Sequence, residues 1–265
     1  MSLQIIQVLY NQKFSHNSFF GTNKIYVCDN STNDEIKSYN KNYCIEQNFT
    51  YVDMQGNFGL PKAYNEAISL IEKNPQNWIL ILDQDTELSS DFLEKYETAI
   101  KNNPDKKIFA PVIKDSVGIM SPSLKKGMGF AHSQLIDFNK EISNYSFINS
   151  GLCVNSMIFE TVQYDENMFL DMVDYDFIEN VRKKFGTEIF YVIQDLKIYQ
   201  NFSGVTKNSL QSDIIRFKIL IKDQTYYYKK NYNNNVFNKK KLFLRALKLN
   251  LQHRTLRFFK LLGEK

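Results

Sequence analysis

Cysteine is scarce in this sequence, and so are the patterns that depend on it. The three cysteines, Cys28, Cys44 and Cys153, are widely spaced and include no C-x-x-C pair. An odd, scattered set argues against both a disulfide framework and a structural zinc site. Isolated cysteines are typical of proteins from the reducing cytosol, so we expect a cytoplasmic protein.

The sequence also lacks a long hydrophobic run. No stretch approaches the roughly 18 uninterrupted apolar residues of a membrane-spanning helix, and the first residues read as a strand and not as a secretory signal. With 43% hydrophobic residues in a chain of 265, a sizeable core can still be buried. This length suits one large domain, with or without an appendage.

Neither a Walker A sequence nor a G-x-G-x-x-G fingerprint is present, so those phosphate loops are excluded. The nearest alternative is the stretch 55–62, where glycines precede a predicted helix start. Glycines allow close backbone approach, and a helix N-terminus favours phosphate. We take Asn57, Gly59 and Lys62 as candidate nucleotide-binding residues, with an ordinary helix-start loop as the other interpretation.

Strand and helix signals alternate through the first half of the chain. The predicted strands are 3–10, 24–28, 49–54, 78–82 and 108–113, and the predicted helices are 32–42, 59–72 and 91–102. This rhythm is typical of an α/β fold with a mostly parallel central sheet and helices on both faces.

The second half is less regular. Residues 115–150 predict irregular structure and an antiparallel edge, 169–185 a helix, and 191–193 and 197–199 two short strands. From residue 209 onward the pattern is helical, broken near 231–235. We therefore expect a domain at 1–208 and a helical C-terminal extension at 209–265.

Polar residues follow the predicted strands. Asp83, Gln84 and Asp85 come directly after the apolar run 78–82, and Asn11 and Asp29 follow two earlier strands. Ligands of open α/β sheets bind beyond the carboxyl ends of the strands, and hard cations that hold phosphates prefer carboxylate oxygens. A nucleotide could lie across this edge, with Asp29 at its base and Asp85 at its metal, although each residue alone is a routine turn residue.

A second acidic cluster comprises Asp171, Asp174 and Asp176. In a helix that begins near here, Asp171 and Asp174 lie on one face at i, i+3. Acids in a first helical turn also suit the helix dipole, which is the purely structural interpretation. The functional interpretation is a general base that removes a proton from a hydroxyl group.

These pieces, in this order and spacing, resemble family 2 glycosyltransferases of the GT-A fold, especially the bacterial rhamnosyltransferase-like branch. The resemblance covers roughly residues 3–204. It rests on Tyr10-Asn11, Asp29-Asn30-Ser31, Asn57-Phe58-Gly59, Leu82-Asp83-Gln84-Asp85, Asn149-Ser150-Gly151 and the stretch 169–177.

The resemblance implies roles for these residues. Tyr10, Asn11 and Gln84 would join the nucleotide site, and Asp29 would contact the base. Asp83 and Asp85 would form the D-x-D pair, with Mg²⁺ or Mn²⁺ held mainly by Asp85.

On the acceptor side, Asp174 would be the catalytic base, with Asp171 as the alternative. Asp176 would be the second acid, which orients the helix or the acceptor loop, and Ser150 and Gly151 would meet the acceptor. The family often completes its metal site with a His near the last strand, which this chain lacks; Gln200 is the candidate replacement.

The implied function is an inverting transfer of rhamnose or a hexose from a dTDP- or UDP-sugar. The acceptor would be a glycan or a lipid-linked molecule in bacterial surface polysaccharide synthesis. The alternatives are a sugar nucleotidyltransferase, although the first loop lacks the basic triphosphate-binding pattern, and a non-catalytic glycan-binding protein on a transferase fold.

Charge is distributed unevenly along the chain. Residues 229–265 carry a net charge of +10, against −6 for residues 1–228. The segment 238–262 combines basic residues with an apolar stripe formed by Leu244, Leu247, Leu251, Phe258 and Leu262. Such a helix lies on anionic membranes, or else packs on the catalytic domain or on a second subunit in a homodimer. We expect no nucleic-acid partner.

Overall fold

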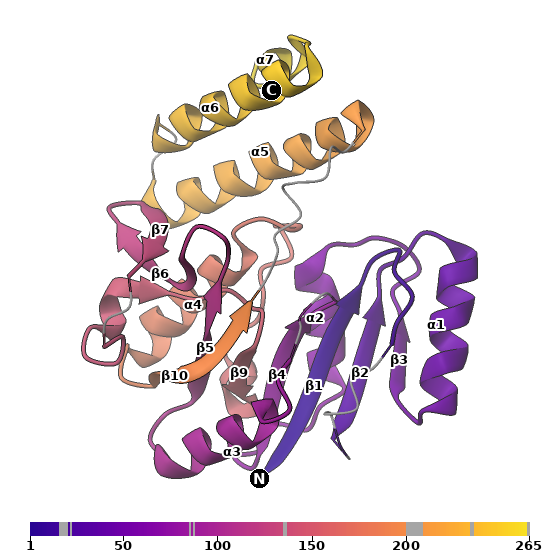
Figure 1. Cartoon of the computed structure of the whole chain (residues 1–265), viewed down its shortest axis with the longest axis vertical. Helices are drawn as coiled ribbons and strands as arrows, with labels where there is room; N and C mark the ends of the chain where they lie inside the picture. Colours follow the sequence, from indigo (N-terminus) through magenta and orange to yellow (C-terminus); the bar gives the residue numbers. More distant parts are fainter. Residues whose placement is uncertain are drawn as a thin grey trace.

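The computed structural model describes residues 1–15, 21, 23–84, 86, 88–134, 137–199, 209–233 and 236–263. Within these ranges the strands form one sheet in the order β3-β2-β1-β4-β9-β5-β6-β7 (Figure 1). Strand β10 pairs with β5, and β8 pairs with β6. The sheet thus joins the two halves of the chain, because β4 from the first half pairs with β9 from the second.

The first half of the sheet is parallel. Its strands are β1 (Ser2–Leu9), β2 (Lys24–Asp29), β3 (Thr50–Asp53) and β4 (Asn77–Asp83). Parallel strands end at the same edge of a sheet, so the polar residues after β1, β2 and β4 are brought together there.

The second half mixes directions. Its strands are β5 (Ile108–Lys114), β6 (Ile119–Lys126), β7 (Gly129–Ser133), β8 (Tyr145–Ser146), β9 (Leu152–Asn155) and β10 (Phe190–Tyr199). Strands β6 to β8 form the antiparallel edge that the composition of 115–150 predicted. The two short strands expected at 191–199 are one strand, β10, with a register shift between Ile193 and Lys197.

Helices cover both faces of the sheet. Helices α2 (Leu60–Ser69) and α4 (Val173–Phe185) pack on one face, while α1 (Asp34–Glu46) and α3 (Phe92–Asn102) pack on the other. Along β4, Ile79 and Ile81 point into the first layer, and Trp78, Leu80 and Leu82 into the second. This strand is continuously apolar because both of its faces are buried, and the predicted α/β class is confirmed.

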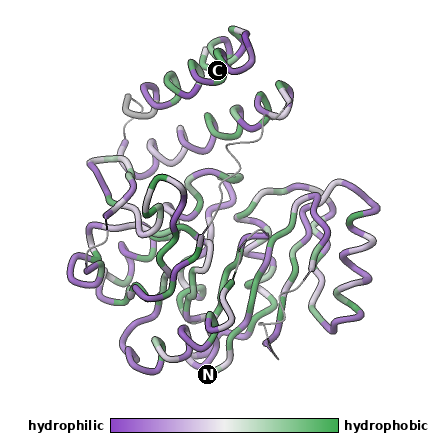
Figure 2. The backbone as a smooth tube through the Cα atoms, viewed as in Figure 1, coloured by the Kyte–Doolittle hydropathy of each residue, from purple (hydrophilic) through white to green (hydrophobic). Residues whose placement is uncertain are grey.

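The C-terminal helices form an additional layer at one end of the molecule (Figure 1). They are α5 (Leu210–Tyr232), α6 (Val236–His253) and α7 (Arg257–Leu261). Figure 2 shows hydrophobic and hydrophilic residues alternating around α5 and α6, as expected for helices that are buried on one side only. None of the described helices is both long and apolar enough to cross a membrane.

Helix α5 belongs to two cores at once. Its Phe217 packs with α6 and α7 in a small separate cluster, whereas Tyr227 and Tyr228 are buried in the main core with α2 and α4. The boundary expected at 208/209 therefore precedes a helix that is packed into both parts of the chain.

Candidate functional site

Two adjoining cavities lie beyond the carboxyl ends of the parallel strands. The strand-end cavity, of about 690 Å³, lies between the ends of β1 and β4 and the start of α5. The acidic cavity, of about 330 Å³, lies between β4 and the start of α4. Both are lined by Leu60, Asp83, Leu170 and Arg216. Molecules bound in the two cavities would therefore meet beside Asp83.

Five of the predicted nucleotide-binding residues line the strand-end cavity: Tyr10, Asn57, Gly59, Asp83 and Gln84. The Oε1 atom of Gln84 accepts a hydrogen bond of 2.9 Å from the backbone N–H of Tyr10. This bond links the ends of β1 and β4, so the chain segments that follow the two strands form one wall of the cavity.

Asn11 and Lys62 do not line this cavity and have other partners. The Oδ1 atom of Asn11 accepts a hydrogen bond of 2.9 Å from the backbone N–H of Thr32. The ammonium group of Lys62 lies 4.4 Å from the centre of the Phe58 ring. Asn11 thus shapes the turn after β2, while Lys62 packs on the loop ahead of α2.

Asp29 is fully buried and lines neither cavity. Its carboxylate accepts hydrogen bonds from the backbone N–H of Ser31 at 2.9 Å, the amide of Asn40 at 2.8 Å and the hydroxyl of Tyr51 at 3.2 Å. With both oxygens engaged, Asp29 holds the turn after β2, and the next residue, Asn30, faces the cavity instead.

Gly59 is required by the loop that faces it. Its φ is 88°, and a Cβ atom there would lie 2.6 Å from the backbone oxygen of Phe169. The same oxygen accepts a hydrogen bond of 2.8 Å from the N–H of Leu60. The backbone that approaches this glycine closely is the loop before α4. The contact with a nucleotide phosphate expected at Gly59 stays a prediction.

Asp83 is the described half of the expected D-x-D pair. It ends β4, its side chain is partly buried, and it lines both cavities. Asp85 and Gln200 lie outside the described residues. Among the residues that are described, no three His, Cys, Asp or Glu side chains form a metal-binding group. Asp83 suits one oxygen ligand of a hard cation at the junction of the cavities.

Asp174 presents a carboxylate to the acidic cavity from the first turn of α4. Burial, together with the negative charges of Asp83 and Asp171, raises its pKa to about 7 against the lowering effect of the N–H of Tyr175. That N–H donates a hydrogen bond of 2.8 Å to Oδ1. A carboxylate with a pKa near neutrality is well matched to accept a proton from a hydroxyl group.

Asp171 lines the same cavity but is not part of the helix. The expected helix at 169–185 begins only at Val173, after Met172 with a φ of 63°. The i, i+3 relation between Asp171 and Asp174 was therefore a wrong prediction. Both oxygens of Asp171 accept hydrogen bonds from the guanidinium of Arg216, one of them at 2.8 Å.

Asp223 explains why the helix starts late, and sequence reasoning missed it. This fully buried carboxylate on α5 accepts hydrogen bonds from the backbone N–H groups of Phe169, Leu170 and Asp171, at 3.0, 2.7 and 2.9 Å. A single acid in a long helix carries no local signal of such a role. The loop that positions Asp171 and Asp174 is thus held from the C-terminal part of the chain.

Asp176 is buried on the opposite side of α4 from the cavities. Its carboxylate accepts hydrogen bonds from Asn180 and Lys230, each at 2.8 Å, and from Asn231 at 2.9 Å. These contacts tie α4 to the end of α5. Asp176 lines neither cavity, and its contacts are those of a residue that orients the helix.

Ser150 and Gly151 take different positions. The hydroxyl of Ser150 lies 3.1 Å from that of Thr86, and Ser150 lines the acidic cavity. Gly151 is buried behind it, with a φ of 74°, and a Cβ atom there would lie 2.7 Å from Cγ of Pro111. Gly151 thus permits packing beneath the cavity, while Ser150 faces its interior.

Comparison with known proteins adds a family and a fold. The sequence profile described as Glycosyl transferase family 2 matches residues 9–169, more than half of the chain. That range contains the ends of β1, β2 and β4 and reaches the loop held by Asp223. The comparison with curated protein sequences found no match.

Several solved structures share the fold. S. aureus TarS 1–349 is 13% identical with a TM-score of 0.55, over 88% of this chain and 74% of that one. Mannosyl-3-phosphoglycerate synthase from Rubrobacter xylanophilus is 11% identical with a TM-score of 0.56, over 89% and 76%. The mannosyltransferase PcManGT from Pyrobaculum calidifontis, in complex with GDP-Man and Mn²⁺, is 12% identical with a TM-score of 0.54, over 88% and 64%.

Proposed function

We propose, since this chain belongs to glycosyl transferase family 2 and has a GT-A-like fold, that it is an inverting glycosyltransferase. The donor would be a dTDP- or UDP-sugar that carries rhamnose or a hexose, and the acceptor a glycan or a lipid-linked molecule of a bacterial surface polysaccharide. The observation that carries this proposal is the placement of Asp174 and Asp83 on two adjoining cavities.

In this mechanism the strand-end cavity holds the nucleotide and the acidic cavity holds the acceptor hydroxyl. Asp174 takes the hydroxyl proton while the acceptor oxygen forms a bond to the anomeric carbon. The bond from that carbon to the diphosphate oxygen breaks on the opposite side, and the nucleoside diphosphate leaves with the electron pair. One displacement of this kind inverts the anomeric configuration.

Asp83 and Asp85 are the residues that would hold Mg²⁺ or Mn²⁺. When bound, such an ion neutralises negative charge on a departing diphosphate. The structural neighbour PcManGT is described with GDP-Man and Mn²⁺, and TarS is described with UDP-GlcNAc. These neighbours support the class of donor and cofactor.

Donor binding should depend on Asp85. In a thermal-shift screen of UDP-, dTDP- and GDP-sugars, we expect the best donor at about 100 times its Kd to raise Tm by roughly 5–10 °C when Mn²⁺ is present. Asp85→Ala should abolish the part of this shift that requires Mn²⁺, because a hard cation loses a carboxylate ligand.

Asp105→Ala is the matched control, because Asp105 is an exposed acid paired with its neighbour Lys106. An unchanged Mn²⁺-dependent shift in the Asp85 variant would contradict the metal assignment. Release of nucleoside diphosphate from the same donor, measured in parallel, distinguishes transfer chemistry from binding alone.

Part of the predicted apolar stripe on the C-terminal helices remains exposed. Leu244, Leu247 and Leu251 are 55%, 39% and 72% exposed on α6, among basic residues of the same helix. Phe258 is fully buried, and Leu262 packs against the same cluster. The exposed leucines would support peripheral contact with an anionic membrane on the cytoplasmic side.

Changing Leu244, Leu247 and Leu251 together to Gln should lower co-sedimentation with phosphatidylglycerol vesicles at least tenfold, since each leucine loses apolar area that the membrane would bury. Leu256→Gln is the control, because Leu256 is also exposed but lies outside α6. Equal co-sedimentation of the triple variant and the wild type would overturn the membrane proposal. Truncation at residue 228 is a poorer test, because it removes Lys230 and Asn231, which bind Asp176.

A further inference from the structure

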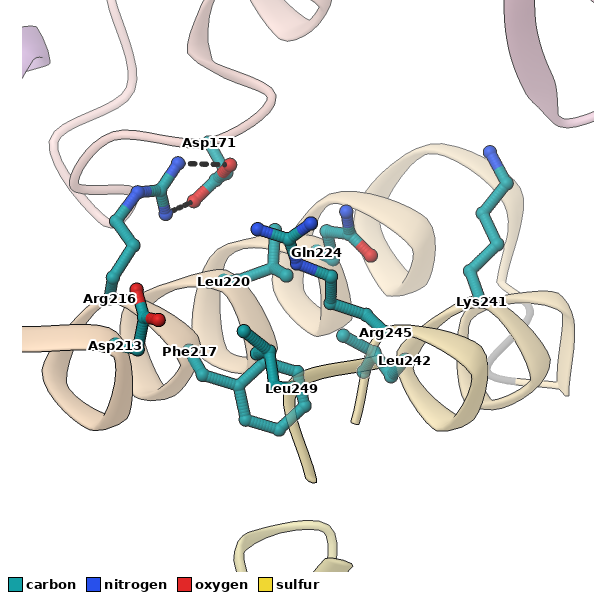
Figure 3. A pocket seen from close by; sticks show the side chains of 10 residues that line it. All are labelled: Asp171, Asp213, Arg216, Phe217, Leu220, Gln224, Lys241, Leu242, Arg245 and Leu249. Carbon is teal, nitrogen blue, oxygen red and sulfur yellow. Dashed lines mark hydrogen bonds and ion pairs between the residues drawn. The ribbon is translucent and has the colours of Figure 1, made fainter. Parts of the chain in front are cut away.

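A third cavity of about 340 Å³ lies between α5 and α6 (Figure 3). It shares Asp171 and Arg216 with the acidic cavity. A ligand that occupies the acidic cavity could therefore extend past this ion pair into the space between the two helices. We call this space the interhelical groove.

The groove has an apolar base and a basic opening. Apolar side chains from both helices form the base: Phe217, Leu220, Leu242 and Leu249. The charged side chains are Arg216, Lys241 and Arg245 against Asp171 and Asp213. Figure 3 shows the guanidinium of Arg245 beside Gln224 and Leu220, between the Asp171–Arg216 pair and Lys241.

The two acids of the groove are already engaged by other residues. Asp171 receives both hydrogen bonds of the Arg216 guanidinium. Asp213 lies 2.6 Å from Nε2 of His253 and accepts a hydrogen bond of 3.3 Å from Gln252. Neither carboxylate is therefore paired with Arg245.

Two polar groups of the groove have no protein partner among the described residues. Within the described part of the chain, Arg245 makes no hydrogen bond or ion pair, and the buried Oε1 atom of Gln224 accepts none. The groove thus offers a planar cation, a second positive charge at Lys241 and a buried hydrogen-bond acceptor, which together suit an anion that carries a hydroxyl group nearby.

We propose that the interhelical groove binds a phosphate group of the acceptor, so that this enzyme glycosylates a phosphate-bearing polyol or glycan. The proposal rests on the proposed function of the acidic cavity. Arg245 binds the phosphate in a bidentate manner, Lys241 adds charge, and Gln224 accepts a hydrogen bond from a neighbouring hydroxyl. The hydroxyl to be glycosylated then lies in the acidic cavity beside Asp174.

The donor's diphosphate is a poor candidate for this groove. Arg245 and Lys241 line neither the strand-end cavity nor the acidic cavity. Asp83, where the diphosphate and its cation belong in the mechanism, does not line the groove. Lys241 and Arg245 therefore select on the acceptor side.

The test measures phosphate binding without any donor, so it does not depend on catalysis. The probe is a soluble oligomer of glycerol phosphate, titrated into the full-length protein by calorimetry. We expect the double variant Lys241→Gln and Arg245→Gln to bind at least tenfold more weakly, because charge-assisted hydrogen bonds to phosphate are lost. Lys248→Gln, an exposed basic residue of α6 outside the groove, should bind like the wild type.

Equal affinity of the double variant and the wild type for both the oligomer and the lipid vesicles of a second arm, or an equal loss in the Lys248 variant, would overturn the proposal. A second arm uses neutral vesicles that contain a polyprenyl diphosphate lipid. If the double variant binds only these vesicles tenfold more weakly, the phosphate belongs to a lipid-linked acceptor. If it binds only the soluble oligomer more weakly, the phosphate belongs to a polymer. Donor hydrolysis should be unchanged in the double variant. If the wild type did not hydrolyse any donor, the proposed function would be rejected, whereas the measured difference in phosphate binding would still hold.

Discussion

Replacing Asp174 by Asn should lower sugar transfer at least ~100-fold, the scale of general-base catalysis. An amide cannot take the acceptor proton, while its oxygen can still accept the hydrogen bond from Tyr175 that Asp174 accepts now. Donor binding should persist, because Asp174 lines the acidic cavity and not the strand-end cavity. Steady-state transfer and donor-induced thermal shifts measure the two effects separately.

The same substitution should stabilise the protein at high pH. The pKa of Asp174 is raised from 3.8 to about 7 by burial and by neighbouring negative charge. The folded state then binds more protons than the unfolded state between about pH 4 and 7, so this group lowers the stability as pH rises through that window. The Asn variant lacks this loss of stability. The full pKa shift would correspond to roughly 4 kcal/mol, and we expect about half of that because solvent screens a side chain that is only partly buried.

The comparison variant is Asp171→Asn. We expect it to keep most of the transfer activity, because both oxygens of Asp171 are engaged by Arg216. In Tm measurements at pH 5 and pH 8, the advantage of the Asp174 variant over the wild type should be larger at pH 8. Near-normal transfer by Asp174→Asn, with a large loss in Asp171→Asn, would move the base role to Asp171.

Replacing Asp223 by Ala should be the most destabilising single change around the site. Three partly buried N–H groups, of Phe169, Leu170 and Asp171, would lose their acceptor. An unsatisfied buried donor costs ~1–3 kcal/mol, and partial burial places these three in the lower half of that range, so the expected loss of unfolding free energy is ~3–6 kcal/mol. Transfer should fall as well, even below the melting temperature, because this loop leads directly into the helix that carries Asp174.

Asp223→Asn is the informative companion variant. Its amide keeps one oxygen acceptor, so urea unfolding should show a smaller loss than for Asp223→Ala. Asp195→Ala is the control, since Asp195 is an exposed acid on β10, away from α5. Equal unfolding free energies of Asp223→Ala and the wild type would show that the hydrogen bonds of Asp223 do not stabilise the loop 169–171.

The layout of the site followed from local sequence patterns. An apolar strand that ends in Asp83 was placed correctly, because continuous apolar runs indicate strands buried on both faces. Parallel strands bring their carboxyl ends together, which is why Tyr10, Asn30 and Asp83 line one cavity. The acids near residue 174 were recognised as a cluster because they are close in sequence.

The partner of each acid could not be predicted in the same way. Asp29 is surrounded by Asn40 and Tyr51, which lie on a helix and a strand that follow it. Asp171 is paired with Arg216, and Asp176 with Lys230, across more than forty residues of chain. Such contacts depend on how α5 docks, and no periodicity in the sequence records that docking.

The sequence alone thus determined most of the elements, their order, the edge of the sheet that carries the candidate site and the family to which the chain belongs. Tertiary structure alone decided how the carboxylates of Asp171, Asp174 and Asp176 are paired. Helix α5 engages Asp171 through Arg216 and Asp176 through Lys230, while Asp174 faces the acidic cavity. The reason is physical: periodicity reflects burial along one element, whereas the ionisation of a carboxylate depends on charges and donors that distant elements place beside it.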